Sequence, residues 1–322
     1  MSAVKVAAVI PNWNGAERLP RCLASLRAQT RPFDRIIVVD NGSTDGSAEL
    51  AAVRLSENRG FAVAVNRGVA EAADADWIAV LNNDVVLDPG WLAALLTAPP
   101  FDLATGRTLQ MVNPALLDGA GDALSRGLAA VRLGHGHSDG PDYRRPRPVL
   151  GVCFSAALVR QEVFRKVGGL EERFFAYLED VEFCLRAQLA GFRAQFVPEA
   201  VAHHEGSSST TGPLDPRVVT WMTANQLLLA ARYARGPLWP RVLLTQALWA
   251  ARMVRHARLV AWLRGVVGAL ATMSEMRATA PGFDTARLLE LLRESEVQIY
   301  EDRGTVDSFW RSYFAFFPAG RI

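Results

Sequence analysis

A hydrophobic stretch that ends in two amides and a carboxylate is the first place where this sequence could do chemistry. The run Trp77–Leu81 is apolar throughout and is followed at once by Asn82, Asn83 and Asp84. Such a run predicts a strand buried on both faces, whose polar successors lie at the carboxyl edge of a sheet, where open α/β sheets bind ligands. Oxygen donors beside one aspartate suit a hard divalent cation that also binds a diphosphate. A polar turn completed by Asp88-Pro89-Gly90 is the alternative.

A second carboxylate, Asp40, follows the predicted strand Arg35–Val39, and Trp13 follows the predicted first strand Val4–Ile10. An acidic residue at such a position can hold a ribose hydroxyl, but the turn around Trp13 lacks the glycine-rich fingerprint of dinucleotide-binding enzymes. A nicotinamide enzyme is therefore not expected. Asp40 could accept hydrogen bonds from a nucleotide, and Trp13 could stack on its base. The alternatives are a helix cap for Asp40 and a core position for Trp13.

A third candidate lies where a helix is predicted to start near Asp180. Glu179 and Asp180 would then occupy a helix N-terminus, where the macrodipole favours ionised carboxylates. An ionised carboxylate facing a pocket can act as a general base. Simple capping of the helix is the alternative.

Two adjacent histidines, His203 and His204, follow a further predicted strand, Phe192–Val197. Neighbouring residues of an extended segment point to opposite faces, so at most one of the two can join a given site.

Strand patterns alternate with helical ones along the first two thirds of the chain, which predicts an α/β fold with a mostly parallel sheet covered by helices. Helices are expected after the first strand, in the segment that begins at Glu57 and runs to about Ala73, and around Trp91. From Arg107 to Pro148 glycine, proline and arginine accumulate, which predicts a loop able to cover a substrate; Gly134-His135-Gly136-His137 fits a flexible turn better than a metal site.

Bulk composition excludes several classes of protein. The 322 residues carry a formal net charge of +2, which gives no global basic field for nucleic acid. Cys22, Cys153 and Cys184 show no metal-ligand spacing and are expected to be small buried residues in a reducing cytoplasm. The short apolar run near the start does not resemble a signal peptide, and no segment approaches the roughly 20 uninterrupted apolar residues of a membrane span.

Taken in order, these motifs resemble the inverting family 2 nucleotide-sugar glycosyltransferases of the GT-A fold, and in particular the rhamnosyltransferase-like members. The resemblance covers roughly residues 4 to 212. It rests on Pro11 to Gly15, Val39 to Gly46, Asn58-Arg59-Gly60-Phe61, Asn66-Arg67-Gly68, Leu81 to Asp84, Asp118 to Gly121, Gly168-Gly169-Leu170, Phe174 to Asp180 and His204-Glu205-Gly206.

The resemblance implies a role for each matched position. Asp180 would be the catalytic base, and Asp84 and His204 would bind Mg²⁺ or Mn²⁺ carried by the donor diphosphate. The remaining contacts to the nucleotide sugar would come from Pro11, Trp13, Asn14, Asp40, Asn41, Arg59, Gly60, Asn66, Asn82, Asn83 and Glu179. Asn82 departs from the family's first metal-site carboxylate, which predicts weaker cation binding by the protein alone.

The last third of the chain changes character. From Leu214 to Arg264 arginines are interleaved with tryptophan and leucine, and Asp215 is the only acidic residue. This pattern is typical of amphipathic helices at a membrane surface, although a helical cap or a dimer interface is compatible with it. Two domains are expected, a catalytic domain at residues 1–212 and a helical region at 213–322.

The expected function is therefore metal-dependent, inverting transfer of a sugar from a dTDP-rhamnose or UDP-sugar donor to a hydroxyl of a glycan or lipid-linked acceptor in polysaccharide synthesis. The expected location is the cytoplasmic face of the membrane. The rival interpretation is a catalytically silent GT-A subunit that only binds nucleotide sugar or scaffolds an assembly complex. A sugar-nucleotide pyrophosphorylase is disfavoured, because it needs a glycine-rich basic loop after the first strand.

Overall fold

The computed structural model describes residues 4–98, 100–206, 212–304 and 307–319. It divides into two compact units. The first comprises residues 1–121 and 134–206, and the second comprises residues 122–133 and 207–322. The expected boundary near residue 212 adjoins residues 207–211, which lie outside the described part of the chain.

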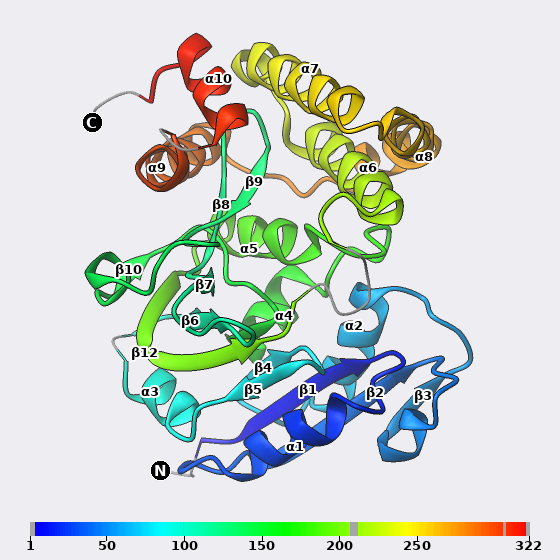
Figure 1. Cartoon of the computed structure of the whole chain (residues 1–322), viewed down its shortest axis with the longest axis vertical. Coiled ribbons are helices and arrows are strands. Elements are labelled where there is room, and N and C mark those ends of the chain that lie inside the picture. The colour runs from blue at the N-terminus through cyan, green and yellow to red at the C-terminus, as the bar shows by residue number, and fades with distance from the viewer. Residues whose placement is uncertain (1–3, 99, 207–211, 305–306, 320–322) are drawn as a thin grey trace. The chain divides into compact units, whose positions relative to one another are not determined.

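The first unit is built on one large mixed sheet (Figure 1). Its described strands are β1 (Val6–Asn12), β2 (Arg35–Asn41), β3 (Val53–Leu55), β4 (Trp77–Leu81), β5 (Val85–Leu87), β6 (Leu103–Gln110), β7 (Leu117–Gly119), β10 (Arg147–Pro148), β11 (Ala156–Arg160) and β12 (Ala194–His204). Its helices are α1 (Leu19–Arg27), α2 (Phe61–Glu71), α3 (Trp91–Thr97), α4 (Gln161–Val167) and α5 (Glu179–Leu189). The prediction of an α/β fold is confirmed.

The directions of the strands decide which strand ends lie together at one edge of the sheet. β4, β1, β2 and β3 are parallel neighbours, so their carboxyl ends share one edge. β11 runs antiparallel to β4 and pairs Ala156 with Leu81, so the amino end of β11 lies at that same edge. The residues after β1, β2 and β4 and those before β11 are therefore brought together.

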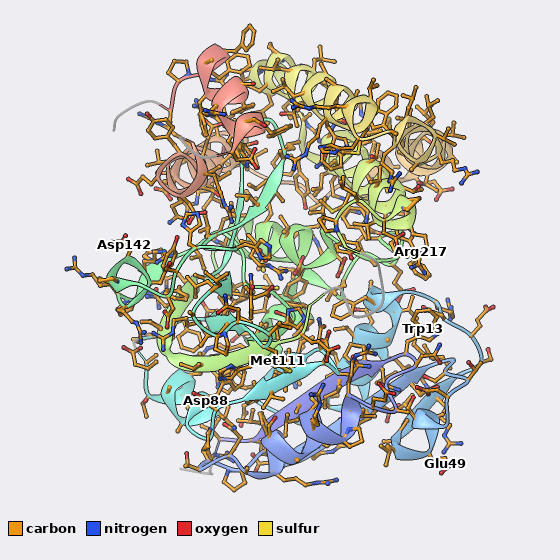
Figure 2. All side chains as sticks on the ribbon, in the orientation of Figure 1. Trp13, Glu49, Asp88, Met111, Asp142 and Arg217 are labelled. Carbon is orange, nitrogen blue, oxygen red and sulfur yellow. The ribbon has the colours of Figure 1, made fainter. Side chains whose placement is uncertain are left out.

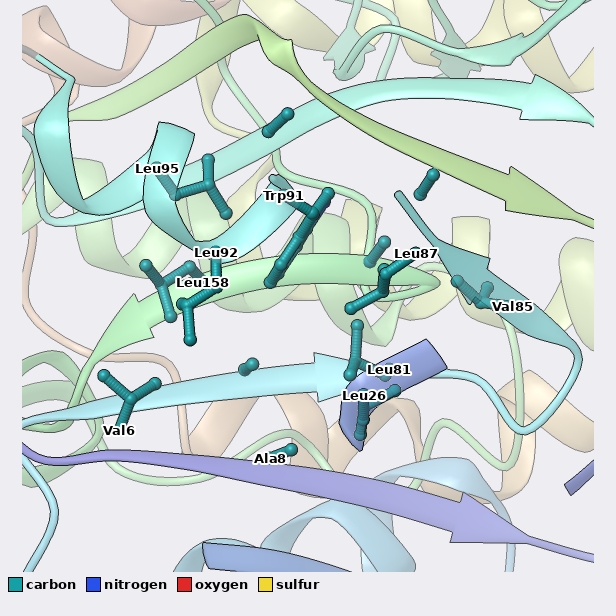
Figure 3. Close-up of a cluster of buried hydrophobic side chains, with 14 of the residues drawn as sticks. Val6, Ala8, Leu26, Leu81, Val85, Leu87, Trp91, Leu92, Leu95 and Leu158 are labelled. Carbon is teal, nitrogen blue, oxygen red and sulfur yellow. The ribbon is translucent and has the colours of Figure 1, made fainter. Parts of the chain in front are cut away.

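Alternation along β1 directs side chains to helices on both faces of the sheet. Val6, Ala8 and Ile10 enter a buried cluster that includes residues of α1 and α3, and Figure 3 shows Trp91, Leu92 and Leu95 within it. On the other face α2 lies so close that a Cβ added at Gly68 would stand 2.3 Å from Val9 Cγ1. The sheet is thus covered on both sides, as its continuous apolar strands require.

The cysteines are free and buried, as the sequence predicts. Burial, together with the negative charge of Asp84, raises the pKa of the Cys22 thiol to about 12.

An irregularity in β12 shapes the strand that carries the histidines. Val197 pairs with Gly106 and Val201 with Arg107, so β12 bulges between these pairs. The carbonyl oxygen of Ala200 in the bulge lies where a side chain at Gly106 would begin, 1.8 Å from an added Cβ. Only glycine permits this close backbone approach.

Gly106→Ala is accordingly expected to destabilise the protein by about 1–3 kcal/mol or more, because the added methyl group must push against backbone and not against a mobile side chain. Chemical denaturation would measure the loss. Gly90→Ala is the matched control, since no atom lies within 4 Å of a Cβ added there, and its effect should stay within about 0.5 kcal/mol. Equal stability of the two variants would contradict the assignment.

The segment from Arg107 to Pro148 is more ordered than predicted. The loop interpretation was wrong where short strands interrupt the segment, namely the end of β6, all of β7 and β10, and the hairpin strands β8 (Asp122–Leu124) and β9 (Ala130–Arg132). These strands are only two to eight residues long, too short for a clear alternating pattern. The expectation for Gly134–His137 holds, because Gly134 and Gly136 adopt positive φ in a turn and His137 Nδ1 lies 2.9 Å from the Tyr143 hydroxyl.

The second unit combines the β8–β9 hairpin with a set of helices. These are α6 (Pro216–Tyr233), α7 (Trp239–Arg255), α8 (Leu259–Ala278), α9 (Thr285–Arg303) and α10 (Ser308–Phe316), so the predicted helical character of this region is confirmed. Hydrogen bonds join the hairpin to α9, among them those that Leu124 N donates to Ser295 Oγ and Arg126 Nε donates to Glu296 Oε2, at 2.8 and 2.6 Å. Glu296 is 1% exposed and also accepts a hydrogen bond from the Tyr313 hydroxyl. The hairpin therefore belongs to the helical unit, although it interrupts the sequence of the first one.

Candidate active site

The centre of the candidate site is a histidine held between two aspartates. His204, the last residue of β12, places Nε2 3.2 Å from Asp84 Oδ1 and Nδ1 2.9 Å from Asp118 Oδ2. Asp84 follows β4, and Asp118 lies in β7, which pairs with β6. All three side chains are at least 90% buried, and Asn82 Nδ2 lies 3.3 Å from the same Nε2. The structure thus brings the two predicted metal ligands together and adds a carboxylate behind the imidazole.

The electrostatics of this cluster favour a positive charge. Burial lowers the pKa of His204, but the hydrogen bonds and negative charges of Asp118 and Asp84 outweigh it and raise the pKa to about 9. Asp84 and His204 supply one carboxylate oxygen and one imidazole nitrogen in contact with each other. A histidine whose second nitrogen is held by a carboxylate is the usual arrangement of a metal-binding imidazole. The donor set therefore fits a divalent cation.

The two histidines do point to opposite sides. His203 places Nε2 3.1 Å from Asp88 Oδ1, and that pair is largely open to solvent, whereas the His204–Asp84 pair is buried. Of the two histidines, His204 is the one beside Asp84, and its role in binding a metal stays a prediction.

A second group of polar side chains spans the carboxyl ends of β1, β2 and β4. Asn12 is 1% exposed; its Nδ2 donates to Asp40 Oδ1 at 3.1 Å and to Ser47 Oγ at 2.9 Å, while its Oδ1 accepts from Asn83 Nδ2 at 2.8 Å. Asp40 Oδ2 in turn accepts from the backbone N–H of Ser43. Asn12 thus links two predicted binding residues, and sequence reasoning missed it. Its signal is its place at a strand end, the same place that singled out Asp40 and Asn82.

Asp180 reaches the same edge through β11. It is the second residue of α5, and its carboxylate accepts from Phe154 N at 3.3 Å and from Val181 N at 2.9 Å. Phe154 lies two residues before β11, and the next residue, Ser155, accepts a backbone hydrogen bond from Asn82 N. Asp180 and Asn82, which lies two residues before Asp84, therefore contact the same short segment, 154–155.

The backbone before α5 is unusual. Tyr177 and Leu178 both adopt positive φ, at 72° and 68°, although neither is glycine. Such residues cost roughly 1–3 kcal/mol each and persist where the surroundings impose them. Here the Phe175 backbone packs directly against Gly60, which has a φ of 93°. The backbone N–H of Phe61 donates a hydrogen bond to the Phe175 carbonyl oxygen. This contact fixes the approach of the chain to Glu179 and Asp180, both buried.

Several predicted binding residues hold loops in place. The Asn41 amide donates to Gly60 O and Asn58 Oδ1 and accepts from Arg59 N. Asn14, at φ 48°, accepts from Thr44 N. Asn66, in the middle of α2, bonds both the N–H and the carbonyl of Leu170. The structure therefore does not bring Asn66 to the cluster around His204.

The other predicted residues differ in exposure. Pro11 is buried in β1 beside Val39, Trp13 is half-buried, and Arg59 is exposed. Within the described part of the chain the Arg59 guanidinium makes no hydrogen bond or ion pair. Trp13 lies well apart from Asp88 (Figure 2), in line with the different positions of the two residues on the sheet.

Comparison with known proteins decides the family. Residues 7–168 match the profile described as "Glycosyl transferase family 2". The chain belongs to this family. The glycosyltransferase is 32% identical over 266 residues to the N-acetylglucosaminyl-diphospho-decaprenol L-rhamnosyltransferase of Mycobacterium tuberculosis, covering 71% of this chain and 86% of the relative. It is 31% identical to the pre-mycofactocin glycosyltransferase of the same organism, covering 62% of this chain and 42% of that one.

Solved structures of glycosyltransferases share the fold. GalNAc-T7, crystallised with UDP, GalNAc and Mn²⁺, superposes with a TM-score of 0.64 at 14% identity; the match covers 93% of this chain and 58% of the length of that one. The mannosyltransferase PcManGT from Pyrobaculum calidifontis, in complex with GDP-Man and Mn²⁺, gives 0.51 at 17% identity, covering 98% and 86%. The chain therefore has the GT-A fold. Its assignment as a nucleotide-sugar enzyme rests on the family match and on the rhamnosyltransferase relative.

Asp118 is the second residue that sequence reasoning missed. It lies in a motif that contributed to the family resemblance, but no strand was predicted there and nothing indicated that β7 returns to His204.

Asp118→Asn removes the negative charge beside His204 Nδ1 while keeping the side-chain volume. We expect Mn²⁺ binding to be about 10–100-fold weaker in calorimetry.

The matched control for this prediction is His135→Gln. The His135 ring also lies near Asp118, with Nδ1 3.7 Å from Asp118 Oδ1, but it is exposed. Mn²⁺ affinity should stay within about twofold of the wild type in this control. If Asp118→Asn bound Mn²⁺ as tightly as the control, Asp118 would have no influence on the metal site.

Proposed function

We propose that this glycosyltransferase moves L-rhamnose from a dTDP-rhamnose donor, or failing that another sugar from a UDP-sugar, to a hydroxyl of a lipid-linked saccharide or glycan in cell-surface polysaccharide synthesis. The choice of sugar and acceptor is supported by the similarity to the mycobacterial rhamnosyltransferase. The observation that supports the chemistry is that Asp84 and His204 lie at the sheet edge where β11 begins, and that Asp180 contacts the segment just before β11. The proposed setting is the cytoplasmic face of the membrane.

In this proposal each group of residues has a separate task. Asp40 and Asn12, with Trp13 and Asn14 nearby in sequence, line the place for the nucleotide. Asp84 and His204 hold a Mg²⁺ or Mn²⁺ ion, which when bound neutralises negative charge that develops on the leaving diphosphate. The loop bonds of Asn41, Arg59 and Gly60 position the neighbouring backbone.

Asp180 acts as the general base. It takes the proton from the acceptor hydroxyl while that oxygen forms a bond to the anomeric carbon. The bond from the anomeric carbon to the diphosphate oxygen breaks on the opposite side, and the nucleoside diphosphate leaves. The configuration of the sugar inverts. The carboxylate of Asp180 accepts hydrogen bonds from the backbone N–H groups of Phe154 and Val181, which hold it at the start of α5.

The proposal is tested by calorimetry of the full chain against dTDP, UDP, GDP and CDP, each with Mn²⁺, with Mg²⁺ and with EDTA. We expect metal-dependent binding of dTDP or UDP. The matching sugar nucleotides are then assayed for transfer to a lipid-linked acceptor, with the anomeric configuration of the product read by NMR. Binding without transfer to any acceptor would favour the silent subunit, and retention of configuration would overturn the assignment of Asp180.

A further inference from the structure

The outer face of α8 is aliphatic where a surface helix is normally polar. Leu259, Val260, Leu263, Val267 and Leu270 are 43% to 66% exposed. Their spacing puts all five on one side of the helix, across its first three turns. A contiguous exposed apolar stripe of this kind marks a surface that meets a partner or a membrane.

α7 continues this pattern. Trp239, Leu243 and Val254 are 44%, 64% and 57% exposed and share one side of α7. α7 ends at Arg255 and α8 begins at Leu259, so the two stripes follow each other through a turn of three residues. We call the eight exposed residues of these two stripes the α7–α8 face.

The inward side of α8 is already occupied by protein. Ala261, Gly265, Ala269 and Met276 are buried, and a Cβ added at Gly265 would stand 2.6 Å from the Thr220 carbonyl oxygen of α6. Among the described helices, α8 is the one long and apolar enough to cross a membrane, and 22% of that stretch is buried. Crossing would require α8 to leave α6, whereas lying in the interface uses only the exposed side. The geometry therefore favours a helix that lies on a bilayer.

Charge distinguishes a membrane from a second copy of the chain. From Leu214 to Arg264 the sequence has eight arginines and one aspartate; of these arginines, Arg232 is buried, and Arg217 and Arg252 form ion pairs with Asp215 and Asp307. Arg255 and Arg264 are exposed, and within the described residues neither guanidinium has a hydrogen bond or ion pair. A symmetric dimer would bring two such cationic surfaces together, while anionic headgroups would complement them.

We propose that the α7–α8 face docks the enzyme on an anionic lipid bilayer, with the aliphatic stripe in the headgroup region and Arg255 and Arg264 on the lipid phosphates. This deepens the membrane setting of the proposed function, but its test involves no catalysis. The protein could bind vesicles without transferring sugar, or transfer sugar without binding vesicles, so the two proposals can be distinguished.

The experiment is flotation of the full chain with vesicles of phosphatidylcholine alone and with phosphatidylglycerol added. The wild type should partition about tenfold more strongly onto the anionic vesicles, less so at high salt. The triple variant Val260→Ser, Leu263→Ser, Val267→Ser should lose about tenfold in partitioning to them. Arg255→Glu with Arg264→Glu should lose a similar factor and most of the salt dependence.

Leu50→Ser is the matched control, because Leu50 is 49% exposed in the first unit, close to the 47% of Leu263. It should bind vesicles as the wild type does. Circular dichroism checks that the variants, all at exposed positions, stay folded. Vesicle binding that both α7–α8 variants leave unchanged would overturn the proposal. The proposal would also be overturned if the wild type did not bind vesicles and light scattering showed it to be a dimer while the triple variant was a monomer.

Discussion

Replacing Asp84 with asparagine is expected to abolish metal-dependent nucleotide binding and to lower kcat/KM by about 100- to 1000-fold. The substitution keeps the volume and removes the buried charge that faces His204 Nε2. A bound cation supplies several kcal/mol of transition-state stabilisation, and each 1.36 kcal/mol is a factor of ten in rate. Calorimetry with the preferred nucleotide and Mn²⁺, followed by initial-rate kinetics, measures both losses.

The chain contains a close control for this experiment. Asp88 contacts His203 at 3.1 Å, almost the same separation as the 3.2 Å between Asp84 and His204, but on the solvent side. Asp88→Asn should therefore leave nucleotide affinity and kcat/KM within about twofold. If both variants lost activity alike, the effect would come from the Asp–His contacts of β12 in general. The metal site would then have to be sought elsewhere.

Asp180→Asn is expected to lower the catalytic rate while leaving nucleotide and metal binding nearly unchanged. Removal of a general base lowers kcat by about 10²- to 10⁴-fold, whereas nucleotide and metal binding need no proton transfer and should remain within about threefold. The asparagine side chain can still accept a hydrogen bond from Phe154 N or Val181 N, so the start of α5 should keep its place. Single-turnover kinetics with saturating donor measure the rate of the chemical step.

Comparison of the two variants separates the two roles. If Asp180→Asn weakened nucleotide binding but left kcat unchanged, Asp180 would be a residue that contacts the sugar donor and not the base. If Asp180→Asn kept the kcat of the wild type, another carboxylate would have to be the base, and the buried Glu179 would be examined first.

The strands and helices of the first unit were largely predictable, because buried parallel strands are apolar throughout and their helices have a clear period. The strand at Trp77–Leu81 was predicted with its exact bounds, and the helix expected near Asp180 begins at Glu179. The segment from Arg107 to Pro148 was not predictable, since its strands are short and separated by turns rich in glycine and proline. What holds them is pairing with β6 and packing on α9, contacts that no local pattern records.

The candidate site divides in the same way. Asp84, Asp180 and His204 follow strands or begin a helix, so their places could be inferred from the elements before them. Asp118 and Asn12 act through neighbours distant in sequence, 86 residues for Asp118 and His204 and 71 for Asn12 and Asn83. The local signals were weak: Asn12 follows a strand as other polar residues do, and Asp118 lies in a matched motif with no strand predicted around it. Asn66, also matched by motif, holds the backbone at Leu170, and its contact to the nucleotide sugar stays a prediction.

The hairpin of β8 and β9 has a consequence for synthesis of the protein. Its partner residue Glu296 lies 170 positions after Arg126. At roughly 5–20 residues per second, the ribosome delivers α9 about 10–30 s after the hairpin has been made. For that time Leu124 and its neighbours have no helix to cover them and can be captured by a chaperone. The same order means that a gene shortened after the first unit would encode a hairpin whose partner is never made.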